Sequence, residues 1–263
     1  MSVELNHRIS GQGEPLILLH GLFGSLENLG GVARRLDDAW QIHGLDQRNH
    51  GSSPHTDEMT YPAMAADVVA YMDAKGIEKA HLLGHSMGGK VAMQVALSYP
   101  DRVRATIVAD ISPVSYQPRH DAILEGMKSL DLRGVKSRTE ADARLAEYVE
   151  TPGVRQFLLK NLERIPKDEI EQDDLLFRWR LNLPVIDASY ANLSAAPEGD
   201  GPHEGKVLFL KGADSAYIQT KHQDTIQSLF PNAELKIIEG TGHWLHAEKA
   251  DTFATLCRQF LEQ

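Results

Sequence analysis

Residues 80–92 read A-H-L-L-G-H-S-M-G-G-K-V-A, and they place the pattern G-x-S-x-G between an apolar run and a helical one. The run 80–83 predicts a buried strand, and 88–99 predicts a helix that ends before Pro100. The small residues between them allow a tight strand-to-helix turn that exposes the Ser86 hydroxyl. Free N–H groups at the start of the helix favour negative charge beside that hydroxyl. The stretch therefore predicts Ser86 as a nucleophile, against the alternative of a serine that only caps a helix.

Short apolar runs and helical segments alternate on both sides of this turn. Buried apolar strands that alternate with helices are typical of a mostly parallel sheet covered on both faces. The predicted fold class is therefore α/β, with a mostly parallel central sheet flanked by helices. Strands are expected at 3–9, 15–19, 40–45, 80–83, 104–109, 206–210 and 235–238, and helices at 61–75, 88–99, 219–229 and 247–261.

The pattern changes between residues 114 and 200, where the segments are helical, charged and without a clear strand. This stretch is too long for a connecting loop, so we expect a helical cap over 114–200, inserted into a core domain formed by 1–113 and 201–263. The Gly- and Pro-rich run 195–205 is its expected exit linker. Apolar helix faces are expected to turn toward the crevice and the core around Ile123, Leu124, Met127, Phe177 and Trp179.

Composition limits the classes of partner. The 263 residues carry a formal net charge of −10, which makes nucleic acid and an anionic membrane surface poor partners. No apolar run approaches the roughly 20 residues of a membrane span, so no membrane insertion is expected. Cys257 is the single cysteine, which excludes an internal disulfide, and we expect it to pack in the last helix. These features predict a cytoplasmic protein that acts on a small molecule.

A histidine late in the chain is the candidate general base. Residues 240–244 read G-T-G-H-W after a predicted strand, so a glycine-flanked loop can bring His243 over Ser86. His85 flanks the nucleophile but should point away from its hydroxyl, and we expect it and His246 to pack. The remaining histidines show no metal-ligand spacing, and neither a metal nor a cofactor is predicted.

Two backbone N–H groups are needed to hold the oxygen of a tetrahedral intermediate. One is the N–H of Met87, directly after the nucleophile. The other should come from the loop H-G-L-F-G (20–24), which follows the apolar run 15–19. We expect Leu22 N–H, with Phe23 N–H as the alternative.

Four motifs together resemble the α/β-hydrolase superfamily over nearly the full chain: L-L-H-G-L-F-G-S (18–25), D-Q-R-N-H-G-S-S (46–53), G-H-S-M-G-G (84–89) and G-T-G-H-W (240–244). A more specific set is similar to the bacterial YbfF-type esterases: H-G-L-F-G-S-x-x-N (20–28), D-I-S-P-V (110–114), R-W-R-L-N-L (178–183) and G-x-G-H-W-x-H-A-E-K (240–249). The resemblance implies a cofactor-free serine carboxylesterase or acyl thioesterase with a helical cap over its site.

The third catalytic residue has two candidates. In the superfamily the acid usually follows the strand seen here at 206–210, in a turn of the form G-x-x-D, but the residue three after Gly212 is Ser215, and Asp214 lies one position early. Some members carry the acid at the end of the preceding strand, where this chain has Asp110. Because a one-residue shift in a tight turn re-aims a side chain, we expect Asp110 to be the acid, with Asp214 as the alternative. Ser215 is then a hydrogen-bonding neighbour.

The predicted activity is hydrolysis of small to medium acyl esters or thioesters by Ser86, His243 and Asp110. Phe23, Met87 and Trp244 are expected to wall an apolar acyl pocket. In the loop 46–53, Asp46 and Arg48 are expected to brace the site loops rather than to react.

Three rival functions are weighed on the same residues. A dehalogenase would need a carboxylate in place of Ser86 and is excluded. A carbon–carbon bond hydrolase or lyase would keep Ser86 and His243 and add an arginine for a substrate carboxylate, for which the cap offers Arg119, Arg155, Arg178 and Arg180. A non-catalytic ligand-binding receptor on the same fold would not label with an active-serine probe.

Overall fold

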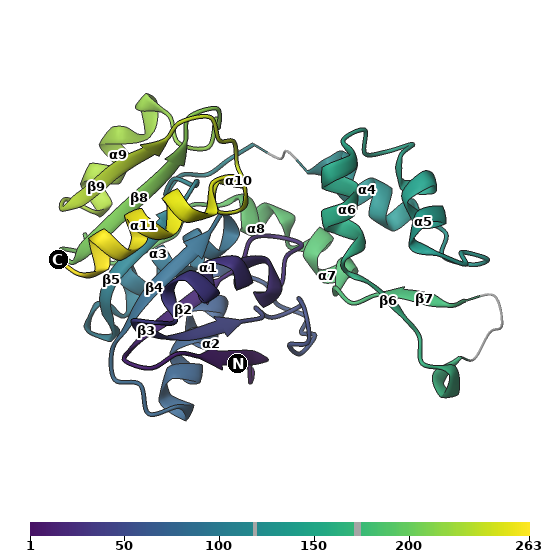
Figure 1. Cartoon of the computed structure of the whole chain (residues 1–263), viewed down its shortest axis with the longest axis horizontal. Coiled ribbons are helices and arrows are strands. Elements are labelled where there is room, and N and C mark those ends of the chain that lie inside the picture. The colour runs from purple at the N-terminus through teal and green to yellow at the C-terminus, as the bar shows by residue number, and fades with distance from the viewer. Residues whose placement is uncertain (118–119, 171–174) are drawn as a thin grey trace.

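The protein is described by a computed structural model, which covers residues 1–117, 120–170 and 175–263. A seven-stranded sheet forms its centre, in the order β1-β3-β2-β4-β5-β8-β9 (Figure 1). All neighbouring strands in it are parallel except the edge strand β1, which runs antiparallel to β3. The strands are β1 (His7–Ser10), β2 (Glu14–Leu19), β3 (Trp40–Leu45), β4 (Ala80–His85), β5 (Val103–Ala109), β8 (Lys206–Gly212) and β9 (Ala233–Ile238). The predicted α/β class is confirmed.

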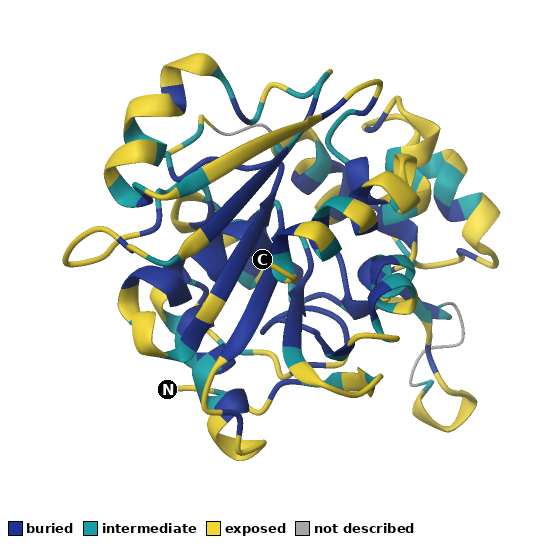
Figure 2. Cartoon of the chain, turned by 60° about the vertical axis from the view of Figure 1, so that its left-hand side comes forward, coloured by how far each residue is buried: buried dark blue, intermediate teal, exposed yellow. Residues whose placement is uncertain are grey.

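Helices cover both faces of this sheet because its inner strands are apolar on both sides. One face carries α2 (Tyr61–Ala74) and α3 (Met87–Ser98), whose buried side chains include Val68 and Val91. The opposite face carries α1 (Gly30–Leu36) and α11 (Ala250–Leu261), which contribute Leu36, Phe253 and Cys257 to a second hydrophobic cluster. The expected packing role of Cys257 is confirmed, since its side chain is fully buried. Figure 2 shows the inner strands buried along most of their length and the outer helix surfaces exposed.

The remaining elements of the core are short. The 3-10 helices are η1 (Leu26–Leu29), η2 (Pro100–Arg102) and η4 (Thr220–His222), and the last part of the chain adds α9 (Gln223–Leu229) and α10 (Leu245–Glu248). The segment 26–36, which forms η1 and α1, is helical although the sequence patterns above did not single it out. In the part of the chain that the structure describes, no helix is long and apolar enough to cross a lipid bilayer.

The segment between β5 and β8 lies to one side of the sheet (Figure 1). Its helices are α4 (Asp121–Ser129), α5 (Arg138–Leu145), α6 (Pro152–Leu159), η3 (Lys167–Glu169), α7 (Leu183–Ala188) and α8 (Tyr190–Ser194). The expectation of helices alone is wrong, because β6 (Leu162–Arg164) and β7 (Phe177–Trp179) pair as an antiparallel hairpin. Each strand has only three residues, which is too short for an alternating pattern to stand out in the sequence.

The inserted segment is joined to the core by one continuous hydrophobic cluster. Leu124 and Met127 of α4 belong to the same cluster as Val68 and Val91 on the sheet-covering helices. Trp179 Nε1 donates a hydrogen bond to the Met127 carbonyl, 3.2 Å away, which ties the hairpin to α4. Of the apolar residues expected to face inward, Leu124, Met127 and Phe177 are buried, whereas Ile123 and Trp179 are half-buried against the same cluster.

The strand ends determine which residues can meet. In the sheet Leu19 is level with Gly84, and His85 is level with Ala109. The loops after β2, β4 and β5 therefore leave the same edge of the sheet, side by side. In open α/β sheets this carboxyl edge is where ligands bind.

Candidate active site

Ser86 occupies a strained turn between β4 and α3. Its φ of 54° and ψ of −119° lie in a region that few side chains adopt. The turn is so tight that a Cβ on Gly84 would lie 2.0 Å from the Gly88 carbonyl oxygen, and one on Gly88 would lie 2.1 Å from the Leu19 carbonyl oxygen. The glycines of the pattern are thus required by close backbone approach, and they hold the Ser86 hydroxyl above the sheet edge.

The structure brings Ser86, His243 and Asp110 into one line of hydrogen bonds. Ser86 Oγ lies 3.0 Å from His243 Nε2, and His243 Nδ1 lies 2.7 Å from Asp110 Oδ2. With Nδ1 as the donor to the carboxylate, Nε2 accepts from the serine hydroxyl. The Asp110 side chain is fully buried, whereas that of His243 is 27% exposed. The imidazole therefore links a buried carboxylate to a hydroxyl at the site.

Asp110 is held by the end of β8 and by the turn after it, the turn that also contains the alternative candidate Asp214. Gly212 N–H, at the end of β8, donates to Asp110 Oδ1 at 3.1 Å, and the Ser215 hydroxyl donates to Asp110 Oδ2. Asp214 is exposed, and its backbone N–H donates to the Thr241 carbonyl instead. Ser215, three residues after Gly212, thus faces the site at the position where the superfamily usually carries its acid. In this chain Ser215 donates a hydrogen bond to the Asp110 carboxylate instead of supplying the carboxylate.

The loop that carries His243 is fixed at several points. Gly242 N–H donates to Glu248 Oε2 at 2.7 Å, and the Tyr217 ring stacks on the His243 ring with centroids 4.2 Å apart. His85 is buried, and its Nε2 donates to the His243 carbonyl at 2.7 Å. The expectation that His85 only packs is therefore incomplete, because it also holds the backbone of the residue that faces Ser86. His246 is buried against His85, with ring centroids 4.3 Å apart.

The loop after β2 is held at Phe23 from both sides. Phe23 has a φ of 61°, and its N–H donates to His50 Nε2 at 3.2 Å. Asn161 Nδ2, from the inserted segment, donates to the Phe23 carbonyl at 2.7 Å. The Phe23 N–H is therefore occupied, which favours Leu22 among the two expected oxyanion donors. Leu22 and Met87 line the same cavity as Ser86.

Two neutral histidines support this loop, and sequence reasoning assigned neither of them a role. His20 Nδ1 donates to the Gly21 carbonyl at 2.8 Å, while its Nε2 accepts from Gln47 N–H at 3.0 Å. His50 Nδ1 donates to the Arg48 carbonyl at 3.0 Å, which leaves Nε2 as the acceptor for Phe23. Burial lowers the pKa of both rings, that of His50 to about 3. Their uncharged form is the one that these bonds need.

The bracing role expected for Asp46 and Arg48 is confirmed. The Asp46 carboxylate accepts from Leu26 N–H at 2.8 Å and from Ser52 N–H at 2.9 Å. Arg48 is buried and forms a bidentate ion pair with Asp67, with distances of 2.6 and 2.8 Å. These contacts join the loop after β3 to η1 and α2, and the same loop carries His50 against the Phe23 backbone.

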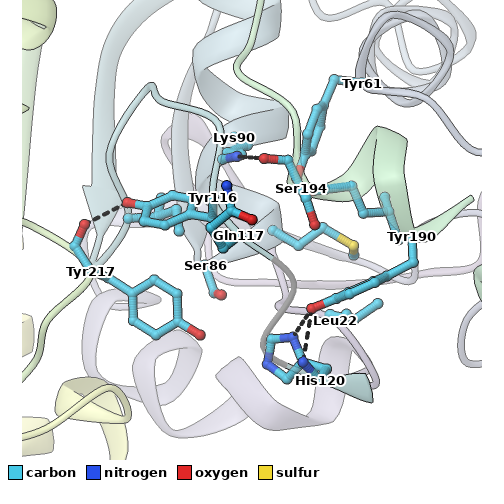
Figure 3. A pocket seen from close by; sticks show the side chains of 13 residues that line it. Leu22, Tyr61, Ser86, Lys90, Tyr116, Gln117, His120, Tyr190, Ser194 and Tyr217 are labelled. Carbon is cyan, nitrogen blue, oxygen red and sulfur yellow. Dashed lines mark hydrogen bonds between the residues drawn. The ribbon is translucent and has the colours of Figure 1, made fainter. Parts of the chain in front are cut away.

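Two cavities share Ser86. The smaller has a volume of about 50 Å³ and is drawn in Figure 3, and the larger has a volume of about 420 Å³. Phe23, Met87 and Trp244 were expected to wall one acyl pocket, but Phe23 and Trp244 line the larger cavity and Met87 the smaller. The expectation of a single pocket is therefore wrong, because Ser86 lies where the two spaces meet.

The arginines that a substrate carboxylate would need lie elsewhere. Arg155 pairs with Asp142 at 3.0 Å, and Arg178 pairs with Glu163 at 2.6 Å and with Glu169 at 2.8 Å. Arg180 is half-buried, and Arg119 lies outside the described residues. Among the described residues, no arginine lines either cavity that contains Ser86. The same part of the chain holds no cluster of three or more His, Cys, Asp or Glu side chains that could bind a metal ion.

Comparison with known proteins places this geometry in context. Residues 14–250 match the model of the α/β hydrolase fold family. The chain is 41% identical over 261 residues to the sn-1-specific diacylglycerol lipase ABHD11 of Xenopus tropicalis, an alignment that covers 96% of this chain and 79% of that protein. It is 38% identical over 251 residues to esterase YbfF of Escherichia coli K12, covering 94% and 92%. A solved marine microorganism esterase superimposes with a TM-score of 0.93 at 40% identity, covering 98% and 100%.

These relatives bear on three of the predictions. The predicted resemblance and the predicted fold are confirmed by the family match and by the superposition. The predicted enzyme class, a carboxylic ester hydrolase, is confirmed by relatives that are named as esterases and a lipase along nearly the whole chain. On this evidence the chain belongs to the α/β hydrolase fold family.

Proposed function

We propose that this protein hydrolyses carboxylic esters through an acyl-enzyme formed on Ser86, with His243 as the general base and Asp110 as the acid of the triad. The observation that supports this most strongly is the unbroken line of hydrogen bonds from the Ser86 hydroxyl through the His243 ring to the Asp110 carboxylate. A hydroxyl, an imidazole and a buried carboxylate in this order are the parts that acyl transfer needs.

The first half of the reaction forms the acyl-enzyme. His243 Nε2 takes the proton of Ser86 as Oγ bonds to the ester carbonyl carbon, and the carbonyl electrons move onto the oxygen. The N–H groups of Leu22 and Met87 bind that oxygen. The bond from carbon to the alcohol oxygen then breaks, and His243 gives its proton to the leaving alkoxide. Asp110 holds the ring in the required tautomer and stabilises the imidazolium between the two transfers.

The second half repeats these steps with water. Water enters from the side that the alcohol has left, gives its proton to His243 Nε2 and attacks the acyl carbon. The tetrahedral intermediate collapses, Ser86 recovers its proton, and the free acid leaves. No other reactant is needed for the atoms to balance.

The substrate is a small-molecule acyl ester, and the same chemistry extends to acyl thioesters such as acyl-CoA.

We assign residues 114–200 as the cap, and 1–113 with 201–263 as the core domain. Ile123, Val154 and Phe157 of this segment line the larger cavity beside Ser86, which supports a role in substrate binding. The cytoplasmic location stays a prediction.

The test of the nucleophile is Ser86→Ala. Removing the hydroxyl should lower ester hydrolysis by on the order of 10³-fold or more with the fold retained, because only binding and the oxyanion donors remain. Hydrolysis of p-nitrophenyl acetate and labelling by a fluorophosphonate probe measure this, and circular dichroism checks the fold.

The matched comparison is His243→Ala alone and together with Ser86→Ala. The two residues act as a unit, so the double variant should be hardly slower than either single one. Near-native turnover by the serine variant, or losses that multiply in the double variant, would contradict the assignment. A native protein that resists the fluorophosphonate would instead favour a ligand-binding receptor.

A further inference from the structure

Ser86 lies where two unequal cavities meet, and Leu22 and His120 also line both. The smaller cavity is bounded by tyrosine rings, among them Tyr61 and Tyr190 (Figure 3). The larger one opens between the loop after β2, helix α6 and the loop that carries His243. An ester has two arms on either side of its carbonyl carbon. A carbon bound at Ser86 must therefore direct one arm into each space.

The position of His243 decides which arm of the ester, acyl or alcohol, enters which cavity. His243 lines the larger cavity and, among the described residues, not the smaller one. The alkoxide must take its proton from His243 Nε2 to leave, and water must later give a proton to the same atom. The leaving arm and the water thus use the His243 side, whereas the acyl arm stays on Ser86 throughout. Resting on the function proposed above, we propose that the small cavity binds the acyl group and the large cavity binds the alcohol, so that the substrates are short-chain acyl esters of large apolar alcohols.

The volumes limit the length of the acyl arm. One water-sized group needs roughly 10–15 Å³ of cavity volume. The small cavity, at about 50 Å³, therefore has room for a short acyl group. The large cavity, at about 420 Å³, is roughly eight times larger and has room for an extended alcohol.

The charge of the small cavity decides between a neutral and an anionic acyl group. Lys90 lines it and is buried, so it is the side chain that could attract a carboxylate. However, Nζ donates to the carbonyls of Val114 at 2.9 Å and Ser194 at 3.2 Å, and to that of Ala195. An ammonium group has three N–H donors, and all three are used by these backbone acceptors. Figure 3 shows the bond to Ser194. The cavity therefore suits an uncharged acyl group.

The wall of the large cavity suits an apolar alcohol. Phe157 of α6 packs on Trp244 with ring centroids 5.6 Å apart, and both rings line the cavity together with Ile123 and Val154. Apolar surface that leaves water on binding stabilises the complex by about 25 cal/mol per Å². The contribution grows with the length of the alcohol, so we expect affinity to rise along an alkyl series.

Two isomeric esters test the assignment directly. Octyl acetate and ethyl octanoate have the same atoms, but the first places its long chain in the alcohol and the second in the acyl group. The native protein should hydrolyse octyl acetate with a kcat/KM at least about tenfold higher, because even one methylene that a hydrophobic pocket does not accommodate costs about that factor. Equal rates, or faster hydrolysis of ethyl octanoate, would overturn the assignment. Loss of all ester hydrolysis, p-nitrophenyl acetate included, would instead count against the proposed function.

A pair of variants separates the two cavities. Leu193, on α8, lines only the small cavity of the two, and Leu193→Ala should raise the rate ratio of p-nitrophenyl hexanoate to p-nitrophenyl acetate. Phe157 lines only the large one, and Phe157→Ala should leave that acyl ratio unchanged while weakening the preference for octyl over ethyl acetate. If Leu193→Ala instead changed the preference for the alcohol and Phe157→Ala changed the acyl ratio, the acyl group would bind in the large cavity and the alcohol in the small one. The isomer comparison on the native protein stands even where a variant does not fold.

Discussion

Single residues at the sheet edge hold Asp110, the proposed acid of the site. Asp110 has a φ of 53°, an unusual value for a residue with a side chain, and its N–H donates to the Leu210 carbonyl at 2.8 Å. This backbone conformation turns its carboxylate toward Gly212 N–H, Ser215 and His243. A buried carboxylate loses its hydrogen bonds to water, and these three partners replace them.

Asp110→Asn tests this assignment at the residue scale. Asparagine keeps the shape but loses the charge that stabilises the imidazolium and fixes its tautomer, so turnover should fall by roughly 10⁴-fold. Asp214→Asn is the matched control, because Asp214 is exposed in the turn and asparagine suits the same turn geometry. Steady-state hydrolysis of p-nitrophenyl acetate at one pH compares the two. A crippled Asp214→Asn beside a near-native Asp110→Asn would move the acid to the turn after β8.

At the scale of elements, the inserted segment reaches into the site through hydrogen bonds as well as apolar contacts. Asn161, between α6 and β6, is buried and donates to the Phe23 carbonyl in the loop that carries Leu22. Asn182, before α7, donates to Asn49 Oδ1 at 3.0 Å in a different loop of the core. Both asparagines join the segment to the core, but only Asn161 contacts the loop of the proposed oxyanion donor.

Asn161→Ala should therefore slow catalysis. It leaves the Phe23 carbonyl without its donor, and a loss of about 1.4 kcal/mol of transition-state stabilisation is a tenfold fall in kcat. Asn182→Ala should lower the free energy of unfolding with kcat close to native. Steady-state kinetics and urea unfolding on both variants measure the difference. Equal effects of the two variants on kcat would show that Asn161 acts through general stability alone.

At the scale of the whole molecule, the buried neutral histidines make folding sensitive to acid. An unfolded histidine binds a proton near its ordinary pKa of 6.5, whereas burial lowers the pKa of folded His50 to about 3 and that of His246 to about 4. Between these values the unfolded chain binds the proton and the folded protein does not. The free energy of unfolding must therefore decrease as the pH falls below 6.5.

For His50 the expected loss is on the order of 3 kcal/mol between pH 7 and pH 4. His50→Gln should be less stable at pH 7, because the bonds to Phe23 and Arg48 change, but its stability should fall less steeply with acid. Urea unfolding of both proteins at several pH values between 7 and 4 gives the two slopes. If the free energies of unfolding of the two proteins fell in parallel with pH, folding would not lower the pKa of His50.

The core elements were predictable because their signals are local. The strand at 40–45 and the helix at 61–75 agree with β3 and α2 to within one residue, since apolar runs and helical periodicity each lie in one stretch of sequence. The turns that carry Ser86 and His243 are also local, since each is flanked by glycines, and the structure places the two side chains 3.0 Å apart. The hairpin β6–β7 was missed because three-residue strands are stabilised by their partner rather than by their own pattern.

By itself the sequence determined the α/β alternation, the turn that presents Ser86 and the loop that presents His243, because each depends on neighbouring residues. Only the tertiary structure decided the contacts between segments that are distant in the chain. One example is the placement of Gly212 and Ser215 against the Asp110 carboxylate, which supports Asp110 over Asp214 as the proposed acid. Asn161 reaches Phe23 across 138 positions of sequence, and the division into two cavities depends on where the inserted segment rests. Such contacts depend on packing geometry, which no local pattern encodes.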